Sequence, residues 1–90
     1  SLTLLEAMSY ERMVIASDVG DARQFIRDGR NGFLIPYPYP FFIDETLERA
    51  WAKREEWKGM GKESSRILKE NITEDPIEIL SKELIQLLKQ

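Results

Sequence analysis

The sequence contains no cysteine and no histidine among its 90 residues. Without thiols or imidazoles, the chain forms no disulfide and no zinc site of the cysteine and histidine type. It also lacks the thiol nucleophile and the imidazole base that many enzymes use. Side-chain acid or base chemistry is therefore left to carboxylates, lysines and tyrosines. We predict no metal ligands and assign no catalytic side chain from the sequence.

Long apolar runs and a strong charge of one sign are missing as well. No apolar segment approaches the ~20 residues that span a bilayer, and no charged and apolar leader opens the chain. The formal net charge is only −3, and no basic stripe with interleaved aromatic residues occurs. Counterion-driven binding to nucleic acid is therefore disfavoured. We expect neither a nucleic-acid partner nor a transmembrane segment.

The composition that remains is globular. Apolar residues make up 42% of the chain and charged residues 32%, a balance typical of folded rather than disordered proteins. A chain of this size forms one small domain at most, and such a domain buries only about 60–65% of the surface of its unfolded chain. We therefore expect residues 1–90 to belong to a single domain of thin stability margin.

A strand, a helix and a second strand are predicted in the first half of the chain. Residues 13–17 begin with a continuous apolar run, as expected for a strand buried on both faces. A short helix over about 22–28 follows, with Gly29 as its left-handed terminator. A second apolar strand over 33–35 is stopped by prolines at 36, 38 and 40, which cannot donate ladder hydrogen bonds. This order predicts a βαβ unit with parallel strands.

An Asn-Gly pair leaves one alternative open for this unit. Asn31 and Gly32 form the dipeptide that most often closes a two-residue β-hairpin. The segment before them lacks strand alternation, which favours the parallel arrangement.

Helical periodicity marks the opening of the chain and all of its second half. Gly59 and Gly61 interrupt the pattern, and Asp44 stands where an N-cap is wanted. The predicted helices cover about 3–10, 44–58, 62–70 and 76–89. Together with the two strands, they give an α/β fold with a core over 1–36 and carboxyl-terminal helices over 41–90.

Several apolar and aromatic side chains in the helical half allow two interpretations. Trp51 and Trp57 lie on one helix stripe, and we expect them to be buried in a core or an interface rather than to hold a base or a sugar. The aromatic segment 37–42 is expected to pack in its loop or on another domain, with contact to an acceptor or a membrane-linked substrate as the alternative. The last helix has an apolar stripe comprising Ile77, Leu80, Leu84 and Leu88.

Two strands and their helices do not make a self-sufficient parallel sheet. Both ladder edges and two apolar faces would remain to be covered. The chain also opens at a helix terminus, where α/β folds place ligands, with no strand before it. We expect an amino-terminal part of the protein to precede Ser1 and to supply the missing strands.

Three sequence blocks resemble a known family. They are LTLLEAM over residues 2–8, VIASDVG over 14–20 and IRDGRNGFLIP over 26–36. In this order and at this spacing they resemble the donor domain of the retaining GT-B glycosyltransferases of family 4. The resemblance implies a partial Rossmann-like carboxyl-terminal domain and an enzyme that transfers a sugar, with retention, from a nucleoside-diphosphate sugar to a carbohydrate or lipid-linked acceptor.

The resemblance also implies roles for particular residues. Glu6 matches the second glutamate of the family's Glu-x7-Glu motif, which accepts hydrogen bonds from the donor ribose. The first glutamate would precede Ser1. Ser1, Leu2 and Thr3 would present backbone N–H groups to the donor diphosphate, as the free N–H groups and dipole of a helix amino terminus allow. No metal or other cofactor is implied.

The implied setting is the biosynthesis of a polysaccharide or glycoconjugate. The parent enzyme would be cytoplasmic, with a peripheral position at the membrane left open. The 90-residue chain alone would be inactive, because part of its donor site would be missing.

Other interpretations of the same residues stay open. Thr3 and Glu6 form the spacing of a capping box, in which each side chain bonds to the other residue's backbone N–H. The whole chain could also be a non-catalytic α/β or helical interaction module that docks through the stripe of the last helix. Two departures from the family pattern are present. The family's Gly-x-Pro-Val entry to the next strand is replaced by Glu11-Arg12-Met13-Val14, which lacks both the glycine and the proline, and Asp21 and Gln24 replace a glycine and a glutamate.

Overall fold

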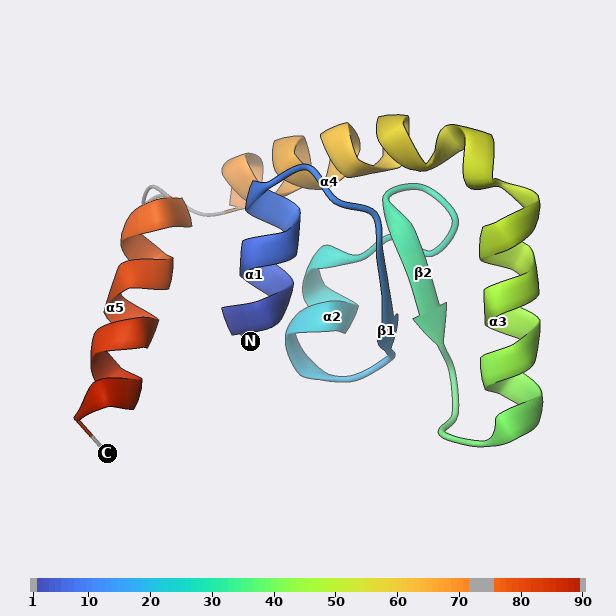
Figure 1. Ribbon diagram of the computed structural model, residues 1–90, viewed down its shortest axis with the longest axis horizontal. Coiled ribbons are helices and arrows are strands. Elements are labelled where there is room, and N and C mark those ends of the chain that lie inside the picture. Colours follow the sequence, from blue (N-terminus) through green and yellow to red (C-terminus); the bar gives the residue numbers. More distant parts are fainter. Residues whose placement is uncertain (1, 72–75, 90) are drawn as a thin grey trace.

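The fold is described from a computed structural model of the chain over residues 2–71 and 76–89. The side chains of residues 2, 3, 21, 76, 77, 79, 80 and 83 lie outside this description. In chain order the elements are α1 (Leu2–Ser9), β1 (Val14–Ser17), α2 (Gly20–Phe25), β2 (Gly32–Ile35), α3 (Pro40–Ala52), the 3₁₀ turn η1 (Arg54–Glu56), α4 (Trp57–Asn71) and α5 (Pro76–Leu88) (Figure 1). The predicted α/β class is confirmed for this part of the chain.

The two strands form a parallel pair. Val14 lies opposite Gly32 and Ser17 opposite Ile35, and α2 connects the strands. The βαβ prediction is therefore correct and the hairpin alternative is wrong. Gly32 allows this close pairing, because a Cβ atom at that position would lie 2.4 Å from the carbonyl oxygen of Val14.

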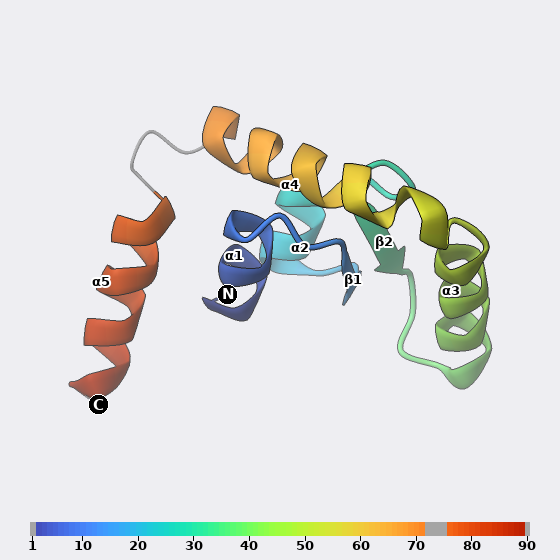
Figure 2. The same ribbon diagram turned by 45° about the horizontal axis from the view of Figure 1, so that its top comes forward.

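Both faces of the strand pair carry apolar side chains, because successive strand residues point to opposite sides. On one face, Val14, Ala16 and Leu34 pack against a buried cluster from α1, α2 and α4, which comprises Leu4, Leu5, Met8, Ala22, Phe25, Ile26 and Leu68. On the other face, Ile15 and Phe33 belong to a smaller cluster with Met13, Ala50, Trp57 and Met60. Figure 2 shows α4 running across the strands and α1, so that α4 contributes to both clusters.

Gly59 and Gly61 do not interrupt a helix, and the predicted break before a helix over 62–70 is wrong. Both glycines lie inside α4, which is continuous from Trp57 to Asn71. Gly61 is where α4 meets the turn after α1, because a Cβ atom there would lie 1.8 Å from the carbonyl oxygen of Glu11. Glu11 itself has a φ of 58°, in the left-handed region. The glycine serves a close approach of two backbones rather than a helix end.

The helix predicted over 44–58 begins earlier and ends sooner. Tyr39 is the N-cap of α3 and Pro40 its first residue, so the Asp44 N-cap is wrong. Proline suits the first helical turn, where its missing N–H would have no intrahelical partner and its fixed φ is already helical. α3 ends at Ala52, and η1 separates it from α4.

The helix predicted over 22–28 is displaced toward the amino terminus and covers Gly20–Phe25. The helix ends where the fully buried side chain of Asn31 bonds to its backbone. Its Oδ1 accepts a hydrogen bond from the backbone N–H of Arg27 at 2.6 Å, and its Nδ2 donates to the carbonyl oxygen of Phe25 at 3.0 Å. These bonds take up backbone groups at the carboxyl end of α2. Gly29 has the expected left-handed conformation, with a φ of 82°.

The two tryptophans differ in burial. Trp57 is half-buried in the smaller cluster, and its Nε1–H donates to the carbonyl oxygen of Ala50 at 2.8 Å. Trp51 is 60% exposed, so it is not buried in the core, and its burial in an interface stays a prediction. On α5, the side chains of Leu84 and Leu88 are exposed, while those of Ile77 and Leu80 lie outside the described residues.

Candidate functional site

The carboxyl ends of β1 and β2 define one edge of the molecule. In Figure 1 both arrowheads point toward this edge, and the amino end of α1 lies on the same side. The turn from β1 into α2 and the aromatic segment before α3 are there as well. Because α/β folds bind ligands at the carboxyl ends of their strands and at the amino ends of nearby helices, this edge is the candidate site.

Glu6 is the carboxylate that α1 contributes near this edge. It lies four residues after Leu2, where α1 begins, and its side chain is exposed. Its backbone carbonyl accepts a hydrogen bond from the hydroxyl of Ser9 at 2.9 Å. Among the described residues, no hydrogen bond or ion pair engages the Glu6 carboxylate. The carboxylate is thus available to accept hydrogen bonds from a ligand.

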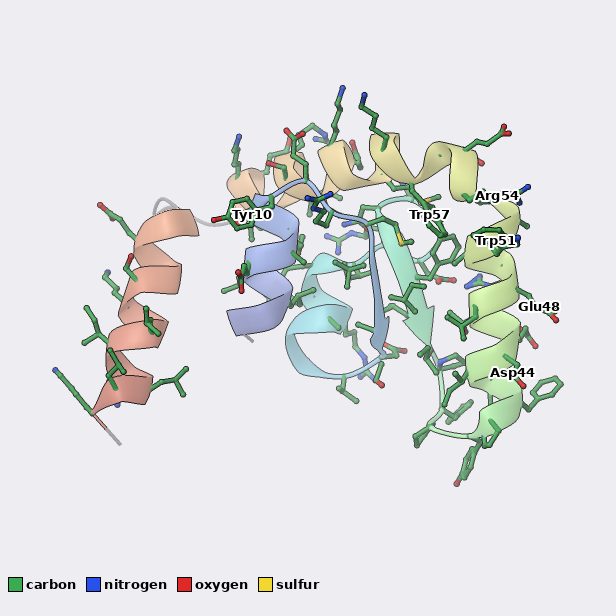
Figure 3. The ribbon with its side chains drawn as sticks, viewed as in Figure 1. Tyr10, Asp44, Glu48, Trp51, Arg54 and Trp57 are labelled. Carbon is green, nitrogen blue, oxygen red and sulfur yellow. The ribbon has the colours of Figure 1, made fainter. Side chains whose placement is uncertain are left out.

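A surface hollow of about 470 Å³ lies beside Glu6. The described residues that line it are Glu6, Ala7, Tyr10 and Arg12. Tyr10 lies at the carboxyl end of α1, as Figure 3 shows, so the hollow extends along the helix rather than around its amino end. Its polar groups are a carboxylate, a phenol and a guanidinium, which suit a ligand carrying both hydroxyl and anionic groups.

A second hollow of about 260 Å³ lies between β2 and α3. Its lining residues are Asp18, Asp28, Leu34, Pro36, Glu45, Thr46 and Arg49. Asp28 forms an ion pair with Arg49 at 2.8 Å and accepts the backbone N–H of Leu34 at 2.9 Å. Arg23 holds Asp18 at 3.0 Å. These two carboxylates are engaged in bracing the loops beside β1 and β2.

A comparison with protein-family models gives one match, to glycosyl transferases group 1, over residues 1–51. This range is more than half of the chain and runs from α1 almost to the end of α3. The chain belongs to the glycosyl transferases group 1 family. Searches of curated proteins and of solved structures returned no match. Membership assigns glycosyl transfer as the general activity, with a nucleotide-sugar donor and an acceptor as the substrates.

The structure describes the four predicted binding residues to different extents. Ser1 lies outside the described residues. Leu2 and Thr3 are the first two residues of α1, but their side chains lie outside the description. The capping-box alternative depends on the Thr3 side chain and therefore stays a prediction. Glu6 alone is placed as a side chain.

Sequence reasoning missed the polar groups of the second hollow. Asp28 and Arg49 are 21 residues apart and lie on a loop and a helix, and no short motif joins them. The same holds for Tyr10 and Arg12 beside Glu6, which belong to no motif of the family resemblance. The one signal in the sequence is their position in the short connection between α1 and β1.

Two side chains of α4, away from the candidate edge, have shifted pKa values. A hydrogen bond from Arg66, together with the charge of Arg30, lowers the pKa of Glu63. Glu63 and Glu70 in turn raise the pKa of Arg66. All these side chains are at the surface, so solvent screens their interactions.

Two further features are absent from residues 2–71 and 76–89. No helix in this part of the chain is long and apolar enough to cross a membrane. No group of three or more acidic side chains within it is arranged to hold a metal ion.

Proposed function

We propose that this chain is the carboxyl-terminal portion of a Rossmann-like donor domain in a retaining GT-B glycosyltransferase of family 4. The protein transfers a sugar from a nucleoside diphosphate to a carbohydrate or lipid-linked acceptor and keeps the anomeric configuration. Family membership over residues 1–51 and the parallel βαβ unit support this proposal.

Glu6 is proposed to accept hydrogen bonds from the ribose hydroxyls of the donor. The observation that supports this role is its exposed carboxylate, without a partner among the described residues, in the second turn of a helix whose amino end lies at the candidate edge (Figure 1). Hydrogen bonds to a charged acceptor are worth about 1.5–3 kcal/mol each, more than bonds between neutral groups. Two ribose hydroxyls shared by one carboxylate therefore supply substantial binding energy.

The amino end of α1 is proposed to receive the donor diphosphate. The first turn of any α-helix has N–H groups without intrahelical partners, and the helix dipole adds a partial positive charge there. In this chain the contributing residues are Ser1, Leu2 and Thr3. As the glycosidic bond breaks, negative charge grows on the leaving diphosphate, and these fixed donors stabilise it without a side-chain acid.

No metal is assigned a role in this proposal. Other cationic side chains of the enzyme are proposed to share the diphosphate charge. Arg12 lines the hollow beside Glu6 but follows the carboxyl end of α1, so it is assigned no contact with the diphosphate.

The role of Glu6 is tested by kinetics of the full-length protein. Glu6→Ala is expected to lower kcat/KM for the donor about 100-fold, which corresponds to about 2.7 kcal/mol of lost transition-state stabilisation. Glu6→Gln keeps one acceptor oxygen without the charge, so its kcat/KM is expected to lie between those of the wild type and Glu6→Ala. The measurement is release of the nucleoside diphosphate at varied donor concentration.

Glu78→Gln is the matched control, because Glu78 is also an exposed glutamate near the start of a helix, α5, and has no proposed donor contact. It should leave kcat/KM unchanged. Thermal unfolding of each variant separates binding from capping. A Glu6→Ala protein with wild-type kinetics and lowered thermal stability would support the capping box and contradict the ribose role.

A further inference from the structure

The solvent side of α3 carries an exposed aromatic platform beside carboxylates. Figure 3 shows Asp44 and Glu48 on the outer side of this helix, away from the strands, and Trp51 near its carboxyl end. Trp51 is 60% exposed, although tryptophan is the largest apolar side chain and is usually well buried. A residue of this kind at the surface needs an explanation other than core packing.

Neighbouring side chains hold the indole of Trp51 in place. The guanidinium of Arg54 lies over the ring, 4.7 Å from the centroid, and donates to the carbonyl oxygen of Trp51 at 3.0 Å. The ring of Trp57 lies 6.0 Å away at 65°, an edge-to-face contact. Trp57 is itself anchored through its Nε1–H to Ala50. The exposed ring is therefore preorganised, which lowers the entropy lost when a ligand stacks on it.

Two carboxylates without a partner among the described residues lie on the same side of α3 as this ring, one and two turns before it. Asp44 and Glu48 stand seven and three residues before Trp51, so the helical repeat places them on the same side of α3. Within the described ranges, neither carboxylate forms a hydrogen bond or an ion pair. They can therefore accept hydrogen bonds from hydroxyl groups of a ligand that rests on the indole.

The chemistry of these groups selects the ligand. The face of an indole carries negative charge density and attracts the weakly positive C–H groups on the flat face of a sugar ring, while carboxylates accept from its hydroxyls. Between Asp44 and Glu56 the chain has five carboxylates and three cations, and one of the cations, Arg49, is paired with Asp28. This surplus of negative charge disfavours phosphorylated or nucleic-acid ligands.

We propose that Trp51, Asp44 and Glu48 form a binding surface for a neutral oligosaccharide, separate from the donor site. This proposal rests on the proposed function only for the biological role of the ligand, which would be a glycan acceptor or product held by its non-reacting sugars. Arg54 and Trp57 are positioning residues for the indole.

The test uses the full-length protein and saturation-transfer NMR with a panel of neutral hexasaccharides, namely malto-, cello-, manno- and β-1,3-gluco-oligosaccharides. At least one is expected to bind with a Kd of about 1 mM. Trp51→Leu, which keeps an apolar side chain but removes the ring, should weaken that binding at least about tenfold. Trp51→Phe should retain most of it. Phe41→Leu, an exposed aromatic residue in the first turn of the same helix, is the matched control and should bind like the wild type.

Two outcomes overturn the proposal. One is that no member of the panel binds the wild-type protein, and the other is that Trp51→Leu binds as tightly as the wild type. A surface for a protein partner would give the first outcome. Titration of the same samples with uridine and guanosine diphosphates separates this proposal from the donor proposal. Nucleotide binding without oligosaccharide binding refutes only the surface, and oligosaccharide binding at Trp51 without nucleotide binding refutes only the donor site.

Discussion

Replacing Gly61 with alanine is expected to destabilise the folded protein by about 3 kcal/mol or more, an effect at the upper end for one added methyl group. The new Cβ atom would lie 1.8 Å from the carbonyl oxygen of Glu11 and 2.6 Å from its carbonyl carbon. These are backbone atoms of the turn between α1 and β1, so no side-chain rotation relieves the overlap. Either α4 or the turn must move, and both the core beneath α4 and the position of α1 would change.

Gly59→Ala is the matched control for this prediction. Gly59 lies in the same helix, two residues earlier, and a Cβ atom there would meet nothing within 4 Å. Because alanine favours the helix over glycine, this change is expected to stabilise the protein by up to about 1 kcal/mol. Chemical denaturation of the full-length variants measures both effects. Equal stability of the two variants would contradict the close approach of α4 to the turn.

Asn31→Ala is expected to cost about 3 kcal/mol. The fully buried amide of Asn31 bonds to the backbone N–H of Arg27 and to the carbonyl of Phe25. Its removal leaves two backbone groups without partners, each worth about 1–3 kcal/mol when buried, and it also opens a small cavity. The backbone carbonyl of Asn31 still accepts from the hydroxyl of Ser64 at 2.7 Å, so the contact between this loop and α4 survives in the variant.

Asn71→Ala serves as the control for Asn31. Asn71 also donates through Nδ2 to a backbone carbonyl, that of Ile67 at 2.8 Å, but it is exposed at the end of α4. Because water replaces the lost bond there, a cost below about 1 kcal/mol is expected. Denaturant titration measures the free energy of unfolding of both variants, Asn31→Ala and Asn71→Ala. A small effect at Asn31 would mean that its buried bonds do not determine the end of α2.

The βαβ unit was predictable because its signals are local. The apolar run before Ser17 and the proline that follows Ile35 mark the two strands, and the structure confirms their parallel pairing. The length of α2 was not predictable, because it depends on the side chain of Asn31 reaching back to Phe25. That bond becomes visible only when the loop conformation is known.

The second half of the chain was predicted less well, for reasons that lie in tertiary contacts. Gly61 reads as a helix breaker in sequence, but its lack of a side chain serves the approach to Glu11, fifty residues earlier. Pro40 reads as the end of a loop, although a proline fits the first turn of α3 equally well. Trp51 reads as a core residue, because its helical spacing from Trp57 does not reveal which side of α3 faces the strands.

For the candidate site, the sequence located Glu6 but not its surroundings. The family resemblance assigned this carboxylate, and the structure places it exposed in the second turn of α1. Tyr10 and Arg12, which share its hollow, come together with it through the turn after α1 and belong to no motif. Binding of the diphosphate at the amino end of α1 remains a prediction, since it depends on Ser1, which lies outside the described residues, and on Leu2 and Thr3, whose side chains do.

The most direct test of the donor site is a calorimetric cycle on the full-length protein and its Glu6→Ala variant. Each is titrated with uridine and guanosine diphosphates and with the 2′,3′-dideoxy form of whichever binds. We expect wild-type binding of one diphosphate to weaken at least about tenfold when either the carboxylate or the ribose hydroxyls are removed, and little further when both are. Binding of neither diphosphate, or additive losses from the two changes, would contradict a bond between Glu6 and the ribose.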